Sequence, residues 1–433
     1  MRNLLKKIIT WKLTWIARAI LWRHEPYIIA VTGSVGKTST KDAIYTVLKS
    51  GGAVRRSEKS FNSELGVPLS IIGAKSGWNS IFSWLEVFVI GFKQVLSTKG
   101  SYPKTLVLEV GADRPGDISS IAKWLRPHIV VITRLPDVPV HIEFFPTVQS
   151  LIEEKISLAR YLRKEGTLIL NADDERVLEA KEIIHARTIT YGVNPIANIR
   201  ATNVQLLPPS DVGAGGLAFK LEFEGKILPV LLPNIYAESF MSVALAALAV
   251  AYVTNQNMVT AINDIGTYET PAGRVHLIAG MHDTVLIDDT YNSSPAACEA
   301  GLRMLHDLPF GKRKVAIIGD MLELGKHTID AHRMIGKQAK THADVLISVG
   351  LRAKECAHGA REAGMKESKI FQTENALDAA ECMKKILKKG DIIYIKGSQG
   401  MRMESTVKEL MAYPDQAHDL LVRQDDKWTK PRA

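Results

Sequence analysis

Cysteine is scarce in this sequence, and its distribution excludes two kinds of site. The three cysteines, Cys298, Cys356 and Cys382, are odd in number, lie far apart and form no Cys-x-x-Cys pair. Neither a disulfide framework nor a zinc site is therefore predicted. This cysteine usage fits a reducing compartment, and we expect the protein to reside in the cytoplasm.

Long apolar runs are also missing. The most apolar stretch, residues 78–96, contains Glu86 and Lys93 and is predicted to form a core or interfacial helix rather than a membrane-spanning one. Internal repeats and low-complexity tracts are absent as well. With 46% apolar and 23% charged residues, the chain has the composition of a folded globular protein.

The first 24 residues contain no acidic side chain. Six of the 55 lysines and arginines lie there, namely Arg2, Lys6, Lys7, Lys12, Arg18 and Arg23. They are interleaved with aliphatic side chains and with Trp11, Trp15 and Trp22, a pattern that predicts a basic amphipathic helix. Such a helix either lies on an anionic membrane surface or packs on the protein's own body, and both alternatives stay open. We do not expect nucleic-acid binding.

A length of 433 residues predicts two or three domains. Apolar runs typical of buried strands alternate with helical segments, which predicts an α/β class with parallel sheets. The first series of strands is expected at residues 27–32, 105–110, 128–133 and 167–171, and the second at residues 284–288, 314–318, 345–349 and 392–395. We therefore divide the chain into a leader helix (1–24), a central domain (25–268), a second α/β domain (269–413) and a polar, peripheral tail (414–433).

The segment Thr-Gly-Ser-Val-Gly-Lys-Thr at residues 32–38 lies where the first predicted strand ends and a helix begins. It is typical of a phosphate-binding loop, in which backbone N–H groups surround a polyphosphate. Lys37 would reach the outer phosphates, and the Thr38 hydroxyl would bind Mg2+. Val31 occupies the place of the first glycine of the usual pattern. The loop predicts a nucleotide site, but kinases, GTPases, motors and ligases share it.

Three further side chains are candidates for metal binding or catalysis. Glu109 ends an apolar strand, and a carboxylate at the carboxyl end of a parallel strand faces the crevice where such sheets bind ligands. His141 and Lys155 follow along the chain, the lysine within a helix expected to begin near Gln149. Each of these two residues alone is more typical of a structural or solvated position. Only their combination with the loop indicates a site.

The order of these segments resembles that of the Mur ligase family, and within it the branch that adds D-alanyl-D-alanine. The resemblance runs from about residue 28 to residue 411. Its segments are the loop at 32–38, Phe-Asn-Ser-Glu-Leu-Gly-Val-Pro at 61–68, Leu-Glu-Val-Gly-Ala at 108–112, His-Ile-Glu-Phe-Phe at 141–145, Lys155, Pro-Ala-Gly-Arg at 271–274, Asp-Asp-Thr-Tyr-Asn-Ser-Ser-Pro at 288–295, Ile-Gly-Asp-Met-Leu-Glu-Leu-Gly at 318–325 and Lys-Gly-Ser at 396–398.

The resemblance implies an ATP-dependent, Mg2+-requiring amide ligase of peptidoglycan precursor synthesis. Such an enzyme activates the carboxylate of a muramyl tripeptide as an acyl phosphate and joins it to D-alanyl-D-alanine. The implied fold is a P-loop ATPase-like central domain with a parallel sheet, followed by a Rossmann-like C-terminal domain. We expect a monomer, located in the cytoplasm or at the inner face of the membrane.

The resemblance also implies roles for individual residues. ATP would be bound by Thr32, Gly33, Ser34, Val35, Gly36, Lys37 and Thr38, and by Arg274 and Asp288, with Asp288 at the ribose. Thr38 and Glu109 would hold one Mg2+, and His141 with a carbamylated Lys155 a second. Lys37, His141 and Lys155 would be the catalytic residues. Asn62, Asn292 and Ser398 would bind the substrates.

Two other functions remain as alternatives. One is a ligase of the same family with another carboxylate, such as an enzyme that extends polyglutamate. The other is a catalytically idle nucleotide-binding subunit that positions a partner on a membrane lipid. Family members of the cell-wall pathway carry a UDP-gripping domain before the phosphate loop, where this chain has the basic helix. A lipid-linked acceptor is therefore also an alternative to a UDP-linked one.

Overall fold

The structure is a computed structural model, and it describes residues 2–58, 61–76, 81–112, 114–135, 145–209 and 215–424, with side chains from residue 7 onward except at 81. The chain forms two compact units. The first contains Met1–Val204, Phe219–Val230 and Phe240–Tyr268, and the second contains Gln205–Ala218, Leu231–Ser239 and Glu269–Ala433. Within the described residues, no helix is long and apolar enough to cross a membrane.

The first sheet has nine strands in the order β2-β3-β1-β4-β5-β6-β7-β8-β9. The strands are β1 (Tyr27–Thr32), β2 (Val54–Arg56), β3 (Thr105–Glu109), β4 (Ile129–Ile132), β5 (Thr167–Asn171), β6 (Arg187–Gly192), β7 (Ile199–Leu207), β8 (Gly216–Phe223) and β9 (Lys226–Pro233). From β2 to β7 every neighbouring pair is parallel, so the carboxyl ends of β1, β3 and β4 meet at one edge. This edge is where parallel sheets bind ligands.

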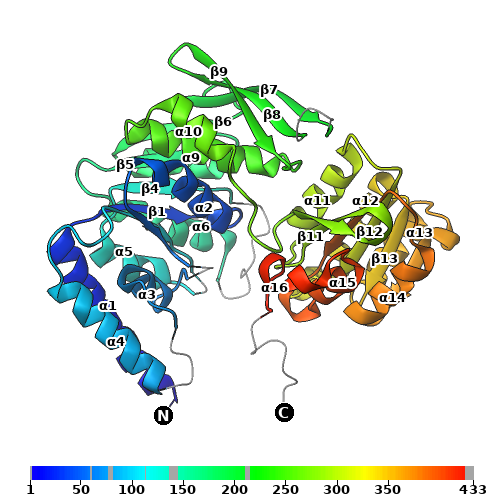
Figure 1. Cartoon of the computed structure of the whole chain (residues 1–433), viewed down its shortest axis with the longest axis horizontal. Coiled ribbons are helices and arrows are strands. Elements are labelled where there is room, and N and C mark those ends of the chain that lie inside the picture. The colour runs from blue at the N-terminus through cyan, green and yellow to red at the C-terminus, as the bar shows by residue number, and fades with distance from the viewer. Residues whose placement is uncertain are drawn as a thin grey trace. The chain divides into compact units, whose positions relative to one another are not determined.

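Helices cover both faces of this sheet, as Figure 1 shows. They are α1 (Arg2–His24), α2 (Lys37–Leu48), α3 (Gly66–Ile72), α4 (Ile81–Leu96), α5 (Asp117–Leu125), α6 (Val148–Ile156), α7 (Glu175–Leu178), α8 (Ala180–Ile183), α9 (Ser239–Val253) and α10 (Met258–Ile265). Alternate strand residues such as Ile28 and Ala30 join one core cluster with the inner sides of α1, α3 and α4. β1, β3, β4 and β5 are buried along almost their whole length because both of their faces are covered, whereas β7 and β9 carry exposed residues.

The second unit has a six-stranded sheet in the order β10-β11-β15-β12-β13-β14. Its strands are β10 (His276–Gly280), β11 (Thr284–Asp289), β12 (Arg313–Gly319), β13 (Val345–Val349), β14 (Ile370–Thr373) and β15 (Asp391–Lys396). Its helices are α11 (Pro295–Asp307), α12 (Thr328–His342), α13 (Lys354–Glu362), α14 (Ala376–Ile386), α15 (Glu404–Leu410) and α16 (Ala417–Leu420). Only the edge pair β10–β11 is antiparallel. The predicted α/β class with parallel sheets is confirmed.

Residues 414–424 differ from the peripheral tail expected from the sequence. Ala417 and Leu421 are 3% and 5% exposed and belong to the core cluster of the second unit. The guanidinium of Arg423 donates to Glu404 over 2.9 Å and to the carbonyl oxygen of Thr290 over 3.3 Å. A few apolar residues within a polar segment are enough to anchor it, and composition alone does not reveal that anchor.

Candidate functional site

The phosphate loop, residues 32–38, joins β1 to α2. The N–H groups of Ser34 and Val35 donate to the carbonyl oxygen of Arg134, just after β4, over 3.0 and 3.3 Å. Lys37 Nζ lies 3.4 Å from the carbonyl oxygen of Ser34, so the lysine folds back over the loop. The loop therefore stands at the carboxyl edge of the sheet, in contact with the neighbouring strand.

Two glycines are required by the shape of this loop. Gly33 has φ 135°, and a Cβ there would lie 2.0 Å from Oγ1 of Thr133. Gly36 occupies the N-cap of α2 in the left-handed region, with φ 83°. A residue with a side chain is strained at both positions, by the clash at Gly33 and by the backbone angles at Gly36. The start of α2 is thus left open to an anion, which the helix dipole favours at that end.

Glu109 is the centre of the polar cluster beside the loop. It ends β3, pairs in register with Val31 of β1 and is 1% exposed. Thr38 Oγ1 donates to Glu109 Oε2 over 2.8 Å, and Asn62 Nδ2 donates to Glu109 Oε1 over 3.0 Å. The structure thus brings together three of the residues that the sequence predicted, from segments 71 and 47 positions apart.

Asn62 is fixed against the turn that follows β3. The N–H of Gly111 donates to the carbonyl oxygen of Asn62 over 2.8 Å. A Cβ at Gly111 would lie 2.9 Å from Nδ2 of Asn62, so a side chain there would displace the Asn62 amide. These contacts hold Asn62, predicted as a substrate ligand, where its amide donates to the Glu109 carboxylate.

The donor set fits a Mg2+-bound polyphosphate. Mg2+ prefers oxygen ligands, and the Thr38 hydroxyl and the Glu109 carboxylate supply two of them side by side. Ser34 Oγ is buried and has no hydrogen-bond partner among the described residues, which suits a hydroxyl that donates to a phosphate oxygen. Within the described ranges, no three His, Cys, Asp or Glu side chains gather into a metal-binding group.

Of the two remaining candidate residues for a second metal, the structure describes Lys155 but not His141. Lys155 lies in α6 and is 4% exposed, so its side chain is directed into the protein. Its neighbour Glu154 accepts hydrogen bonds from the N–H groups of Gly116 and Ile118 over 3.0 and 2.7 Å, which ties α6 to the start of α5. Sequence reasoning missed Glu154, because an acid within a helix gives no local indication of this partner. His141 lies outside the described residues.

In the second unit, Arg274 lies in the turn that leads into β10, and Asp288 lies in β11 next to this turn. Asp288 is fully buried, with Oδ2 accepting from the N–H of Gly273 over 3.0 Å and Oδ1 accepting from the hydroxyl of Thr290 over 2.6 Å. Burial raises the pKa of Asp288 to about 6, although these hydrogen bonds act in the opposite direction. The Arg274 guanidinium stacks 4.2 Å from the ring of Tyr291. Asp288 thus supports the turn that positions Arg274.

A buried ion pair lies near Asn292. Lys396 Nζ donates to Asp289 Oδ2 over 2.6 Å and to the carbonyl oxygen of Asn292 over 3.0 Å. The Tyr394 hydroxyl donates to the same carboxylate oxygen over 2.9 Å. The sequence analysis missed this pair, although Lys396 directly follows the strand predicted at residues 392–395. The position of Lys396 at the carboxyl end of a strand was the one sign in the sequence that its side chain could meet other polar groups at that edge.

Ser398 joins the end of β15 to the Asp-Met-Leu-Glu segment. Its Oγ accepts from the N–H of Leu322 over 2.8 Å, and its N–H donates to the carbonyl oxygen of Asp320 over 3.0 Å. The same segment is held by His332, whose Nε2 accepts from the N–H of Met321 over 3.0 Å. Burial lowers the pKa of His332, which favours the neutral ring with its proton on Nδ1, 2.7 Å from the carbonyl oxygen of Thr328.

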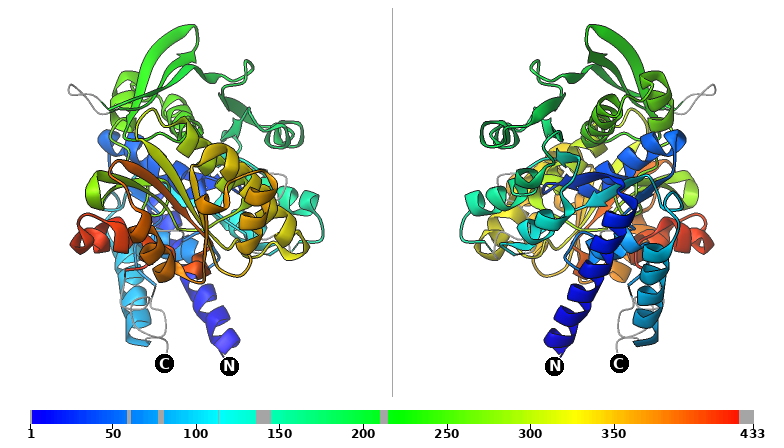
Figure 2. Two further views of the ribbon diagram at one scale, coloured as in Figure 1. Left: turned by 90° about the vertical axis from the view of Figure 1, so that its right-hand side faces the viewer. Right: turned by 90° about the vertical axis from the view of Figure 1, so that its left-hand side faces the viewer.

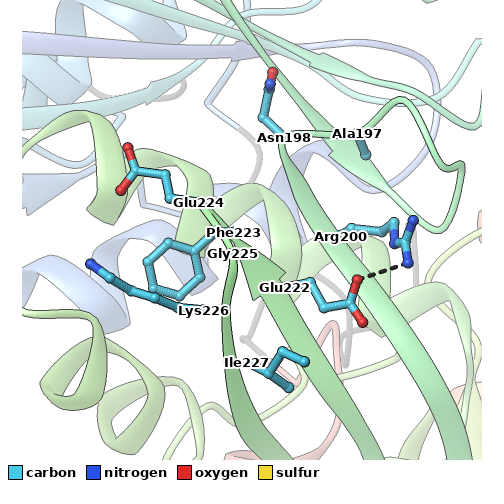
Figure 3. A pocket seen from close by; sticks show the side chains of 9 residues that line it. All are labelled: Ala197, Asn198, Arg200, Glu222, Phe223, Glu224, Gly225, Lys226 and Ile227. Carbon is cyan, nitrogen blue, oxygen red and sulfur yellow. Dashed lines mark ion pairs between the residues drawn. The ribbon is translucent and has the colours of Figure 1, made fainter.

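Two surface depressions lie away from all of these residues. One, of about 270 Å³, is at the β8–β9 hairpin, where Arg200 and Glu222 form an ion pair of 2.7 Å (Figure 3). The other, of about 240 Å³, belongs to the second unit and is lined by Asn234 and by apolar residues that include Tyr236 and Phe310. Neither contains a residue that the sequence predicted for the site.

Comparison with known families identifies this arrangement. The model described as the Mur ligase middle domain matches residues 31–251, which contain the phosphate loop, Glu109 and Lys155. The model described as the Mur ligase, glutamate ligase domain matches residues 273–399, which contain Arg274 and Ser398. The chain belongs to the Mur ligase family. The family expected from the sequence is therefore confirmed.

Relatives of this Mur ligase include two proteins named UDP-N-acetylmuramoyl-tripeptide–D-alanyl-D-alanine ligase. The protein of Bacillus subtilis (strain 168) is 26% identical over 400 residues, which are 92% of this chain and 79% of the relative. The protein of Synechocystis sp. is 29% identical over 388 residues, 89% of this chain and 74% of the relative. The Mur ligase described here thus spans about three quarters or more of their length.

Solved structures give the same fold. MurF from Acinetobacter baumannii superposes with a TM-score of 0.76 at 22% identity, covering 93% of this chain and 80% of that chain. MurF from Thermotoga maritima in complex with ADP superposes with a TM-score of 0.74 at 23% identity, covering 95% and 84%. At this identity the likeness establishes the architecture of the two units.

Proposed function

We propose that this Mur ligase is an ATP-dependent amide ligase that joins D-alanyl-D-alanine to a muramyl tripeptide in peptidoglycan precursor synthesis. The observation that carries the proposal is the buried Glu109 carboxylate, held by Thr38 and Asn62 beside the phosphate loop. Binding of a nucleotide alone requires the loop, whereas the added oxygen cluster suits phosphoryl transfer. The named relatives support the choice of substrates.

The reaction brings two anions together, since a carboxylate oxygen attacks the γ-phosphorus of ATP and ADP leaves. Lys37 would neutralise the phosphate oxygens, and Thr38 and Glu109 would hold Mg2+, which when bound screens the same negative charge. The attack yields an acyl phosphate. The amine of D-alanyl-D-alanine then adds to its carbonyl carbon, and phosphate leaves as the amide forms. Gly33 and Gly36 keep the loop close to the phosphates throughout.

His141 and Lys155 are proposed to hold a second Mg2+, with Lys155 carbamylated. Lys155 is buried in α6, and carbamylation would convert its ammonium into an anion whose oxygen atoms can bind Mg2+. In that case Lys155→Ala abolishes activity, and Lys155→Glu, which restores an anion, retains more activity than Lys155→Arg. The exposed Lys164 supplies a control as Lys164→Ala. Equal activity of the Glu and Arg variants would exclude the carbamate.

From the second unit, we propose that Arg274 reaches the ATP phosphates and that Asn292 and Ser398 lie on the amino-substrate side. Arg274 is half-buried and held by Tyr291, which limits the entropy it loses on binding. Asp288, predicted at the ribose, is fully buried here, so direct contact would require the Gly273 turn to move. Asp288 already acts on Arg274 indirectly, because its carboxylate holds the N–H of the preceding residue, Gly273.

The proposal is tested by product formation from purified protein, ATP and Mg2+. UDP-muramyl tripeptide and a lipid-linked muramyl tripeptide are each paired with D-alanyl-D-alanine, and with L-glutamate as the competing amine. We expect an amide product, ADP and phosphate only with D-alanyl-D-alanine. A glutamate adduct would indicate a ligase of the polyglutamate type, and the absence of phosphate release with every pair would indicate a nucleotide-binding subunit.

We also propose that residues 1–24 bring the enzyme to a membrane surface on the cytoplasmic side. α1 packs on the first unit through Leu13, Ile16, Ala17 and Ile20. Its outer side keeps Trp11, Trp15 and Trp22 exposed by 62%, 59% and 83%. The two alternatives raised by the sequence are therefore compatible, because one side of the helix packs while the other faces out.

A further inference from the structure

The outer side of α4 carries a continuous apolar stripe. Its large side chains, with the exposed fraction of each, are Phe82 (85%), Leu85 (60%), Val89 (45%), Phe92 (57%) and Leu96 (82%). These positions are spaced by three, four, three and four residues, so they follow one side of the helix. The opposite side of α4 contributes Val87 to the core. The helix is therefore apolar on two sides, and only one of them is covered within the first unit.

α1 repeats the same spacing. Ile8, Trp11, Trp15 and Trp22 are exposed, and Arg18 occupies the fourth of the five positions of this stripe. Arg18 lies 5.9 Å from the centre of the Trp15 ring, and Trp11 packs edge-on against Trp15. Lys7 and Lys12 are exposed on the same helix. The stripe of α1 thus combines aromatic rings with cations.

The two helices are held side by side. A Cβ on Gly91 of α4 would lie 2.7 Å from Cγ2 of Ile16 of α1, so glycine permits a close crossing. At their carboxyl ends, Nε2 of His24 lies 2.8 Å from the carbonyl oxygen of Gln94. Figures 1 and 2 show both helices projecting beyond the rest of the first unit. Both stripes therefore belong to one projecting helix pair.

Exposed apolar side chains are concentrated on this pair. Of the 22 large hydrophobic side chains that are exposed in the described residues, nine lie on these two helices. Single exposed apolar residues are ordinary on protein surfaces, but a contiguous group indicates an interaction site. An occupant of this surface must accept aromatic and aliphatic groups together with positive charge.

An anionic bilayer meets these requirements. Tryptophan is favoured at the boundary between lipid headgroups and acyl chains, and lysine and arginine are attracted to anionic headgroups. α1 has no acidic side chain to oppose this attraction, and α4 has Glu86 and Lys93 in balance. A protein partner with an acidic, apolar groove would be the competing occupant, but the three exposed tryptophans favour lipid.

We propose that α1 and α4 together form a docking surface for the headgroup region of a bilayer containing anionic lipids, with α4 supplying most of the aliphatic contact. This inference rests on the proposed membrane contact of residues 1–24 and extends it to residues 81–96. The surface is separate from the phosphate loop. Docking and ligation can therefore be measured independently.

The test is flotation of the full chain with vesicles of phosphatidylcholine alone or with about one third phosphatidylglycerol. We expect wild-type protein to float with the anionic vesicles. Combined Phe82→Ser, Leu85→Ser and Phe92→Ser should lower the partition coefficient at least about tenfold, because three apolar side chains no longer leave water. Combined Lys7→Gln, Lys12→Gln and Arg18→Gln should lower it about fivefold or more, and only with anionic vesicles.

The matched control removes three exposed apolar side chains elsewhere, Val259→Ser, Leu351→Ser and Leu377→Ser, which should float like wild type. Thermal unfolding and phosphate release with soluble substrates, measured on the same samples, verify that each variant folds. If the α4 variant floats like wild type while the α1 variant does not, the contribution of α4 is excluded and the contact of residues 1–24 remains. If wild type does not float, or is a dimer that loses its association in the α4 variant, the lipid assignment is wrong.

Discussion

At the carboxyl edge of the first sheet, polar side chains converge on the Glu109 carboxylate, whereas at the carboxyl edge of the second sheet the two buried carboxylates, Asp288 and Asp289, are paired with a lysine or with backbone and hydroxyl groups. Thr38 and Asn62 bring a hydroxyl and an amide to one buried carboxylate. Asp289 is instead neutralised by Lys396, and both oxygens of Asp288 accept backbone or hydroxyl hydrogens.

This difference separates two uses of buried charge. The first edge holds oxygen atoms that a metal ion and a phosphate can engage, so changes there should affect the reaction more than the fold. The second edge uses its charges to fix turns around Arg274 and Asn292, so changes there should affect the fold first. The following four substitutions test that division, beginning with the largest expected effect.

Lys396→Met should destabilise the protein by about 3–5 kcal/mol, because it leaves the Asp289 carboxylate buried without its cation. The measurement is urea unfolding of the full chain followed by circular dichroism. Lys389→Met is the matched control, since Lys389 pairs with Asp283 at 2.9 Å on the surface, with both side chains more than 70% exposed. That control should change stability by less than about 0.5 kcal/mol. Equal effects of the two variants would contradict the division.

Lys37→Ala should lower kcat about 10²–10³-fold, because the negative charge of the transferring phosphate loses a cation. The free energy of unfolding should change little, since Lys37 is half-exposed. Lys49→Ala, at the exposed end of the same helix, should leave kcat unchanged. If the lost activity of Lys37→Ala is explained by a loss of stability, Lys37 supports the fold, as the charges of the second edge do, and the division is wrong for the loop.

The pH dependence of stability tests Asp288. Burial raises its pKa to about 6, above the value in the unfolded chain, so the folded protein binds this proton more tightly. Its contribution to stability is therefore fully present below about pH 4 and is lost as pH rises through about 6. Relative to Asp288→Asn, wild type should lose about 1–3 kcal/mol across this window. A difference that does not vary with pH would contradict the burial of an ionisable group here.

Glu109→Gln should raise the Mg2+ concentration for half-maximal activity about tenfold or more, because a ligand loses its charge while its shape is kept. The measurement is phosphate release as a function of Mg2+ concentration. Glu153→Gln, an exposed carboxylate, is the control. An unchanged Mg2+ requirement would show that Glu109 supports Thr38 and Asn62 without binding the metal.

Local sequence patterns predicted much of the first edge. The strand, loop and helix around residues 32–38 are encoded in adjacent residues, and the placement of Glu109 follows from the end of an apolar strand. The contact between Asn62 and Glu109 was not predictable, because it depends on the close approach allowed by Gly111. His141 lies outside the described residues, so its expected role remains a prediction.

The features that the sequence did not predict depend on distant partners. Asp289 and Lys396 are 107 residues apart, and only the parallel pairing of β11 with β15 brings them together. The apolar segment at residues 78–96 was expected to be a core or interfacial helix, but which side stays exposed depends on the packing of α1. The anchoring role of Arg423 could not be predicted from the polar segment around it, because its partner Glu404 lies in α15.

The central claim, that the phosphate loop and Glu109 serve to activate a carboxylate, is tested most directly by oxygen-18 transfer. Muramyl tripeptide labelled in its reacting carboxylate is incubated with the enzyme, Mg2+, ATP and D-alanyl-D-alanine, and the released phosphate is analysed by mass spectrometry. An acyl phosphate predicts one labelled oxygen in phosphate for each amide formed. Amide formation with unlabelled phosphate, or with the label in AMP, would contradict the account.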